Sequence, residues 1–300
     1  MAMKKNFGGW AFDVANYTFL TLVALIMLYP FLYVLFVSIS HPAAVSRGEV
    51  SLFPVGFQLE TYSIVFRNQM IVRAYLNTIL YTVTGTSLTL LITCLTAYPL
   101  TRTRLRGRMA ITAIFAITIF FSGGLIPTFL VVKGLRMLDT IWAIIVPGAF
   151  GMWYIIIART NFMQIPESLI ESAYMDGAND WQVLFRVVLP LSKAILATLS
   201  LFIAVGFWNS FFAPLIYLNS ANKMPLQIIL RQLLLSEQHT TLPLSEAVRE
   251  RIQLQGMTGP GLLVSVKMAT IIVGTGPIIL IYPFVQRYFV RGALVGGLKE

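Results

Sequence analysis

The sequence predicts an all-α integral membrane protein with six transmembrane helices and both termini in the cytoplasm. Of its 300 residues, 57% are hydrophobic and only 11% are charged, whereas about 25% of the residues of a typical soluble domain are charged. The apolar residues gather in six long runs, and a helix needs about 20 such residues to cross a bilayer core. Arginines crowd one connection between these runs, and that connection sets the orientation of the chain.

The six apolar runs define a predicted transmembrane domain over residues 17–290. The first run is too long for the core of a signal peptide, and no small-residue cleavage site ends it. Pro30 is expected to kink it, and Gly123, Gly124 and Pro127 interrupt the third run. Backbone groups freed at such residues need partners inside a packed bundle. The predicted spans are 17–39, 74–98, 109–132, 140–158, 191–218 and 262–286.

The distribution of basic residues predicts the topology. The connection between the second and third spans carries Arg102, Arg104, Arg106 and Arg108, and Lys and Arg collect in short cytoplasmic loops. An even number of spans then places both ends of the chain on the same side. The expected cytoplasmic segments besides this connection are 1–16, 159–190 and 291–300, and the long loop 219–261 is expected to be extracytoplasmic.

Several function classes are excluded by what the sequence lacks. The net charge of +10 follows from cytoplasmic loops rather than from nucleic-acid binding, because no basic patch is interleaved with stacking aromatics. One cysteine, Cys94, and two histidines give neither a disulfide framework nor a metal site. There is no phosphate-binding G-x-x-x-x-G-K-[ST] loop and no catalytic motif. We therefore expect a non-catalytic chain without a cofactor.

The cytoplasmic connection 159–190 is predicted to form two short helices joined at a glycine. Pro166 suits the first turn of a helix, where its missing N–H is not needed, and Glu167 places a negative charge in that turn. Gly177 can adopt a positive φ and end the first helix. Asn179 is a plausible N-cap, with Gln182 three residues later as in a capping box.

The second of these helices is predicted to carry an apolar stripe, formed by residues at three- and four-residue steps. Those residues are Trp181, Leu184, Phe185 and Val188. An amphipathic hairpin can lie on lipid or dock on a cytoplasmic partner. A helix lying on lipid favours a Lys/Arg-rich polar face. The acidic face of this hairpin, which favours the partner, consists of Glu167, Glu171, Asp176 and Asp180.

The same segment resembles the EAA loop of ABC-importer permeases. Glu171-Ser172-Ala173, then Gly177, then 187–190 ending in Pro190 keep the spacing of that pattern, E-A-A, three residues, G, nine residues, I-x-L-P. Ser for Ala and Val for Ile are the departures. The resemblance implies the type I permease fold and a coupling role for the hairpin. The ATPase-coupling residues that it implies are Glu167, Glu171, Ser172, Ala173, Asp176, Gly177, Ala178, Phe185 and Pro190.

The resemblance extends to carbohydrate importers. Asp176-Gly177-Ala178, Leu138-Asp139-Thr140 and the segment 207–211 resemble the smaller six-span permease of maltose-type and complex-sugar importers. The resemblance implies a second permease subunit, two ATP-binding subunits, an extracytoplasmic solute-binding protein that contacts loop 219–261, and an oligosaccharide substrate. A permease of the same superfamily for another solute and a secondary transporter remain alternatives.

Polar and aromatic residues inside the spans are candidates for the substrate path, because polar groups are costly in the bilayer. Trp208, Asn209 and Phe211 lie in the fifth span and Asn77 in the second. Aromatic faces and amide groups suit sugar C–H patches and hydroxyls. Helix–helix packing is the alternative for each of them.

Overall fold

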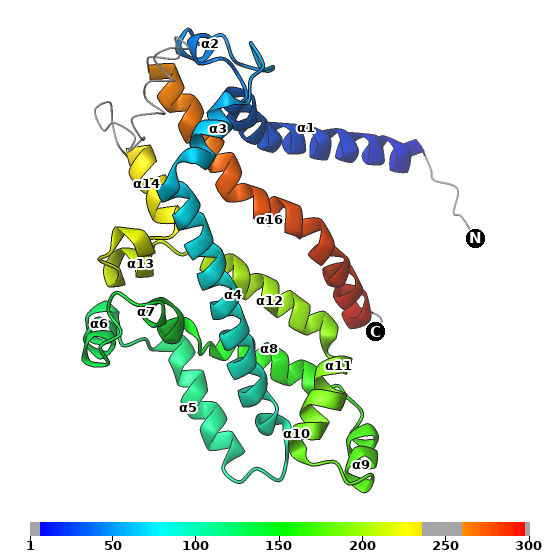
Figure 1. The fold of residues 1–300 in the computed structure, drawn as a ribbon. Coiled ribbons are helices and arrows are strands. Elements are labelled where there is room, and N and C mark those ends of the chain that lie inside the picture. Colours follow the sequence, from blue (N-terminus) through cyan, green and yellow to red (C-terminus); the bar gives the residue numbers. More distant parts are fainter. Residues whose placement is uncertain (1–6, 236–259, 298–300) are drawn as a thin grey trace. The chain divides into compact units, whose positions relative to one another are not determined.

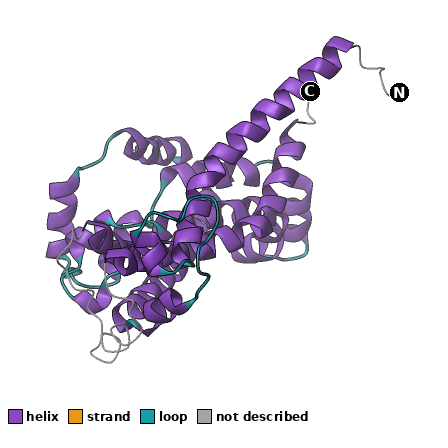
Figure 2. Cartoon of the chain, turned by 90° about the horizontal axis from the view of Figure 1, so that it is seen from above, coloured by secondary structure: helices purple, strands orange, loops and turns teal. Residues whose placement is uncertain are grey.

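The computed structural model describes residues 7–235 and 260–297, and in these ranges every regular element is helical. Figure 2 shows helices and loops and no strand in the described ranges. Residues 1–6 of the expected amino-terminal segment, 236–259 of the expected outer loop and 298–300 of the expected tail lie outside them.

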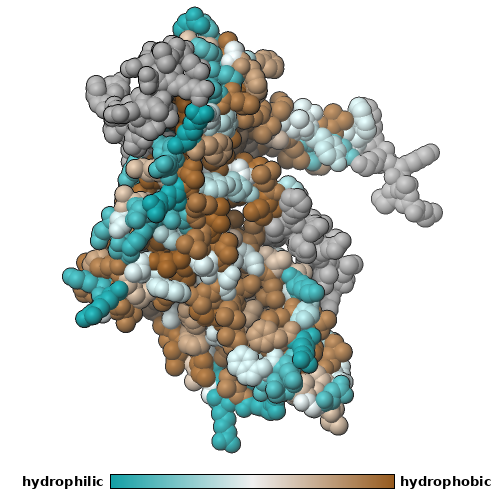
Figure 3. Space-filling view, in the orientation of Figure 1, coloured by the Kyte–Doolittle hydropathy of each residue, from teal (hydrophilic) through white to brown (hydrophobic). Residues whose placement is uncertain are grey.

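Three helices are long and apolar enough to cross a bilayer: α1 (Phe7–Ser38), α4 (Gln69–Ala97) and α16 (Pro260–Gly297). They overlap the first, second and sixth expected spans. Pro30 lies inside helix α1, and the kink expected at this residue stays a prediction. The apolar part of this helix packs little against the chain itself, since only 6% of it is buried. Such a surface requires lipid or another protein around it. Figure 3 shows hydrophobic side chains over much of the visible surface.

Three pairs of helices bend sharply, and each pair can form one broken span. The segment Arg108–Phe120 bends by 115° into Leu125–Gly134, and Trp142–Gly148 bends by 53° into Met152–Phe162. The third pair, Asp180–Leu191 and Lys193–Trp208, meets at 84°. The helices in these pairs are α5 (Arg108–Phe120), α6 (Leu125–Gly134), α7 (Trp142–Ile145), α8 (Met152–Phe162), α10 (Asp180–Val183), α11 (Leu189–Leu191) and α12 (Lys193–Trp208).

The fifth expected span, 191–218, is not one continuous helix. Helix α12 ends at Trp208, and α13 (Phe212–Tyr217) begins after a three-residue break. Asn209 is the C-cap of α12. Pro214 lies in the first turn of α13, where a residue without an N–H is tolerated. Hydropathy averaged over a span does not detect such a break, because the polar pair Asn209 and Ser210 lies between apolar residues on both sides.

Two compact units divide the described chain. The first contains residues up to 72 and 230–275. Within it, the end of α1 joins α2 (Pro42–Ser46) and α3 (Glu60–Arg67), and Ser38 hydrogen-bonds Tyr62 between their hydroxyls at 2.8 Å. Gly261, in the first turn of α16, lies against α2, because a Cβ there would meet the Pro42 carbonyl oxygen at 2.1 Å.

The second unit contains residues 73–229 and 276–300. Its core is formed by buried side chains of α4, α8, α12 and the 159–190 connection. Gly85 of α4 permits close approach of α12, because a Cβ at that position would lie 2.7 Å from the ring of Phe207. This unit also contains α9 (Glu167–Met175) and the start of α14 (Leu226–Leu235).

Candidate functional site

The turn between α9 and α10 is a Schellman motif. Gly177 has φ +81°, and its N–H donates to the Tyr174 carbonyl at 3.0 Å. The Ala178 N–H donates to the Ala173 carbonyl, also at 3.0 Å. This pair of bonds, with a glycine in the left-handed region, ends α9. The Ala-x-x-x-Gly-Ala spacing therefore has a backbone function, and the expected helix end at Gly177 is observed.

Helix α10 begins with the expected capping box. The Asn179 side chain accepts from the Gln182 N–H, and the Gln182 side chain accepts from the Asn179 N–H, both at 2.9 Å. Pro166 immediately precedes α9 as its N-cap, rather than lying in the first turn, and Glu167 follows in that turn. The two helices lie beside the carboxyl-terminal end of α4 (Figure 1).

The predicted apolar stripe of the second helix is divided between two faces, so that prediction is wrong. Leu184 and Val188 are buried in the core of the second unit, whereas Trp181 and Phe185 are 62% and 48% exposed. The two exposed rings stack at 6.3 Å. Residues Leu184–Val188 form a π-helical segment, and its wider i→i+5 turn changes the spacing on which the stripe was based.

The remaining coupling residues of the hairpin are distributed over its surface. Glu167, Glu171, Ser172 and Asp176 are exposed, as is Pro190. Ala173 and Ala178 are half-buried against the core. Ile170 anchors α9 to the core, with 3% of its surface exposed. The hairpin thus presents an acidic outer face and places an apolar inner face in the core.

A polar network that the sequence did not reveal ties the hairpin to the connection that follows α4. The Tyr174 hydroxyl donates to Asp180 Oδ1 at 2.5 Å, and the Arg104 guanidinium pairs with the same oxygen at 3.5 Å. Arg104 also lies 4.9 Å from the centroid of the Tyr174 ring. Burial, followed by the hydrogen bond to Asp180, raises the pKa of Tyr174, so its hydroxyl stays protonated and continues to donate. Arg104 therefore has a structural contact besides its contribution to topology.

The expected substrate-path residues lie in two places. Trp208, Asn209 and Phe211 lie together at the break between α12 and α13. Trp208 is 7% exposed and meets Tyr75 of α4 edge to face, with centroids 5.8 Å apart. Asn77 lies elsewhere on α4. Its amide nitrogen donates to the carbonyls of residues 222 and 224, at 2.9 and 3.1 Å.

Asn77 belongs to a cluster that fixes the segment after α13. Asp139, at a positive φ of 57°, accepts from the N–H groups of Asn219 and Ser220, both at 3.0 Å. Lys223 pairs with the same carboxylate at 2.8 Å. Hydrogen bonds from Lys223 and then Ser220 hold the pKa of Asp139 well below its usual range. The partners are about 80 residues apart in sequence, and for this reason sequence reasoning missed the cluster.

The side chains that could act as metal ligands form no site in the described part of the chain. No group of three His, Cys, Asp or Glu side chains in it could hold a metal ion.

Comparison with known proteins identifies the family. Residues 89–295 match the family described as the inner membrane component of binding-protein-dependent transport systems. YtcP of Bacillus subtilis, a polygalacturonan/rhamnogalacturonan transport system permease protein, is 39% identical over 96% of this chain and 98% of its own length. Protein LplC of the same organism is 38% identical over 99% and 98%.

A solved structure shows the same fold. A chain of a bacterial ABC transporter involved in the import of the acidic polysaccharide alginate has a TM-score of 0.87 and 34% sequence identity, and the match covers 96% of this chain and 100% of that chain. Both sequence and fold thus agree over almost the full length. The chain belongs to the inner membrane components of binding-protein-dependent transport systems, as a multi-pass permease of the ABC-importer type.

Proposed function

We propose that this chain is the translocation subunit of an ATP-driven importer that carries an oligosaccharide delivered by an extracytoplasmic binding protein. The names of its relatives support a sugar substrate, since they refer to polygalacturonan/rhamnogalacturonan and to alginate. In this proposal a second permease subunit completes the path. Two ATP-binding subunits supply the energy, because the chain has no phosphate-binding loop of its own.

The proposed topology has six spans and cytoplasmic termini. The three long apolar helices and the three bent pairs support it, because together they overlap all six expected runs. The four arginines of the 102–108 connection support the placement of that connection and of the hairpin in the cytoplasm. Helix α14 lies within the proposed outer loop 219–261.

The observation that carries the proposal is the rigid hairpin formed by α9 and α10. A Schellman motif ends one helix and a capping box starts the next. Buried Val183, Leu184 and Val188 anchor the second helix in the core. A coupling element must move as a unit when its partner moves, and these contacts give the hairpin that stiffness. Its exposed acidic face is the proposed docking surface for an ATP-binding subunit.

The proposed cycle is the one that the resemblance to ABC importers implies. ATP binding closes the two ATP-binding subunits and draws the hairpins of both permeases together. The core transmits this motion to α12, and the bundle opens outward to receive the sugar. Hydrolysis and separation of the ATP-binding subunits then return it to the inward-open state. Binding energy drives the change only because the ATP-bound partner favours one of the two states.

The break between α12 and α13 is the proposed substrate path. Phe211 is 45% exposed at this position, Asn209 supplies an amide, and the ring of Trp208, 7% exposed in this structure, lies directly beside them in the chain. Trp208→Ala is expected to weaken uptake while leaving assembly intact. Unchanged uptake would assign Trp208 to packing between helices, for example against Tyr75.

Affinity purification of the chain from mild detergent, followed by mass spectrometry and an ATPase assay, tests the proposal. Recovery of an ATPase and a second permease, with activity stimulated by a sugar-loaded binding protein, supports it. Glu171→Lys reverses one charge on the exposed face and is expected to abolish that stimulation. Stimulation by a non-sugar solute would favour another importer of the superfamily. Transport by the chain without any ATPase would favour a secondary transporter.

A further inference from the structure

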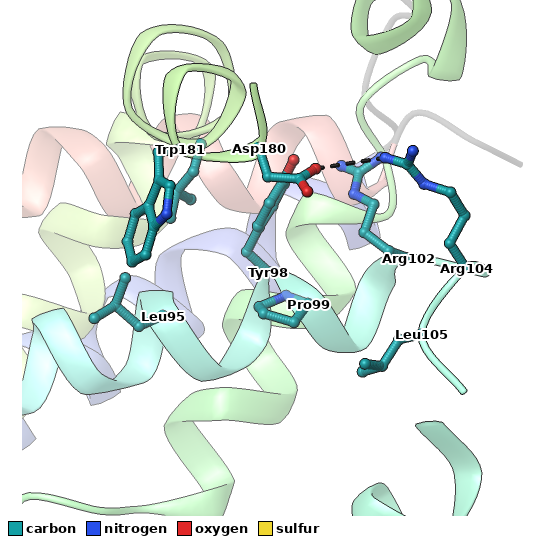
Figure 4. A pocket seen from close by; sticks show the side chains of 9 residues that line it. Leu95, Tyr98, Pro99, Arg102, Arg104, Leu105, Asp180 and Trp181 are labelled. Carbon is teal, nitrogen blue, oxygen red and sulfur yellow. Dashed lines mark hydrogen bonds and ion pairs between the residues drawn. The ribbon is translucent and has the colours of Figure 1, made fainter. Parts of the chain in front are cut away.

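A cavity of about 410 Å³ lies between the last turns of α4 and the start of α10. Ligand-binding cavities typically have volumes of about 300–1,000 Å³. Figure 4 shows Leu95, Tyr98 and Pro99 along the end of α4, with Asp180 and Trp181 across from them. Arg102 and Arg104 line the cavity from the connection that follows. The whole cavity belongs to the second unit.

The lining changes from apolar to basic along the chain. Leu95 and Pro99 belong to the end of an apolar segment that runs from Gln69 to Thr101, whereas Arg102 and Arg104 follow directly after it. If α4 crosses the membrane as proposed, the cavity lies where the apolar core meets the cytoplasmic headgroup region. Trp181, 62% exposed, has the amphipathic ring typical of that depth.

One donor in the cavity has no hydrogen-bond acceptor among the residues that the structure describes. Arg102 Nε is buried and makes no hydrogen bond, although the guanidinium lies 4.7 Å from the centroid of the Tyr98 ring. A buried charged donor without an acceptor is destabilising. The contact between Arg104 and Asp180 is long, at 3.5 Å, and a guanidinium has several N–H donors. Asp180 is the carboxylate that lines this cavity, and Glu167 and Glu171 line a neighbouring cavity with the same two arginines. The buried Nε of Arg102 has no hydrogen bond to any of these carboxylates, so an anionic acceptor fits the cavity at that atom.

The geometry points to a binding site for an anionic phospholipid of the cytoplasmic leaflet, with its phosphodiester at Arg102 and Arg104 and its glycerol and upper acyl chain against Leu95 and Pro99. This inference rests on the proposed topology. A guanidinium binds phosphate oxygens in a planar fork, and basic pockets at the cytoplasmic ends of membrane helices suit lipid headgroups. Free phosphate lacks the apolar part, and a zwitterionic lipid brings its own cation against the arginines.

The site has a consequence for the hairpin. Arg104 contacts both Asp180 and the ring of Tyr174, so a lipid phosphate at Arg104 adds a third contact at the joint between α4 and α10. Bound lipid thereby restrains the hairpin relative to the span.

Lipid retention by the full chain, purified with its copurifying partners, tests the inference. The sample is placed in nanodiscs that contain phosphatidylglycerol and phosphatidylcholine, and native mass spectrometry counts the lipids retained after release. The wild type is expected to retain phosphatidylglycerol in preference to phosphatidylcholine. Arg102→Gln is expected to weaken that retention about tenfold, as for the loss of one charge-assisted contact. Arg106→Gln removes an equal charge outside the cavity and serves as the matched control.

Three outcomes would overturn the inference. Equal losses in both variants would mean diffuse attraction to the basic connection. Displacement of the lipid by inorganic phosphate alone would mean a free-anion site. Loss of the ATPase from Arg102→Gln with lipid retention unchanged would mean that a carboxylate of the partner occupies the cavity. Lipid retention needs no sugar or ATP, so it distinguishes failure of this inference from failure of the proposed importer function.

Discussion

Substitution of Gly177 offers a graded test of the coupling hairpin. A Cβ at this position would meet no atom within 4 Å, so the side chain itself has space. The constraint is the backbone, whose φ of +81° costs an L-residue roughly 1–2 kcal/mol. The gain from a less flexible unfolded chain offsets about 0.4–1 kcal/mol of this cost for Ala. Gly177→Ala is therefore expected to destabilise the hairpin by about 1 kcal/mol, roughly a fivefold change in its local equilibrium.

Two further substitutions at this position bracket the alanine variant. Asn tolerates the left-handed region better than other residues, so Gly177→Asn is the conservative control. Gly177→Pro fixes φ near −65° and removes the N–H that donates to Tyr174 at 3.0 Å. Coupling of ATP hydrolysis to uptake is expected to be strongest with the wild-type glycine, weaker in the Asn variant, weaker still in the Ala variant and absent in the Pro variant.

The assay is sugar uptake per ATP hydrolysed in proteoliposomes with the loaded binding protein. Hydrogen exchange over residues 167–188 reports the hairpin itself. If exchange increases in the order Asn, Ala, Pro while uptake per ATP stays constant, the hairpin does not couple the two processes. If all three variants exchange like the wild type, the argument from backbone strain is refuted.

The remaining predictions concern packing, capping and charge. Gly85→Ala is expected to lower the free energy of unfolding by about 1–3 kcal/mol, because the added Cβ overpacks the contact with Phe207. Adding Phe207→Leu to this variant should recover part of the loss in melting temperature. Gly206→Ala is the control, because its Cβ would meet no atom within 4 Å. Asn179→Ala should increase hydrogen exchange at the start of α10, at a cost of about 0.5–2 kcal/mol, whereas Asn179→Ser should not. The depressed pKa of Asp139 means that its stabilising effect is complete above the unfolded value of about 3.9 and is lost as the pH falls below it. Amides of the segment after α13 should therefore stay protected from pH 8 to about 5, and Asp139→Asn should expose them at every pH.

The sequence predicts best the features that depend on neighbouring residues. The helix end at Gly177 and the capping box at Asn179 follow from local chemistry, and both are observed. The apolar runs likewise overlap helices or bent helix pairs. Helix ends and hydrophobic runs need no knowledge of distant partners.

The features that the sequence does not predict depend on distant or irregular contacts. Asp139 and Lys223 lie far apart in the chain, and the turn that holds Asp139 at positive φ carries no glycine. Residues Leu184–Val188 form a π-helical segment, so the three- and four-residue spacing of an α-helix does not predict which of its side chains share a face. Nothing in the sequence around Tyr174 predicts its contacts with Arg104 and Asp180, because these contacts form only in the folded chain.

The hairpin and the proposed substrate path are joined by a continuous packed core. Val188 of the hairpin and Leu199 and Ile203 of α12 belong to one buried cluster. Phe207, which contacts that cluster, directly precedes Trp208, the last residue of α12 before the break. The helix from residue 193 to 208 has 16 residues and is therefore about 24 Å long. Cores of this density transmit displacement rather than absorb it. In the proposed mechanism, motion of the hairpin therefore reaches the break through α12, without a flexible linker between the two proposed sites.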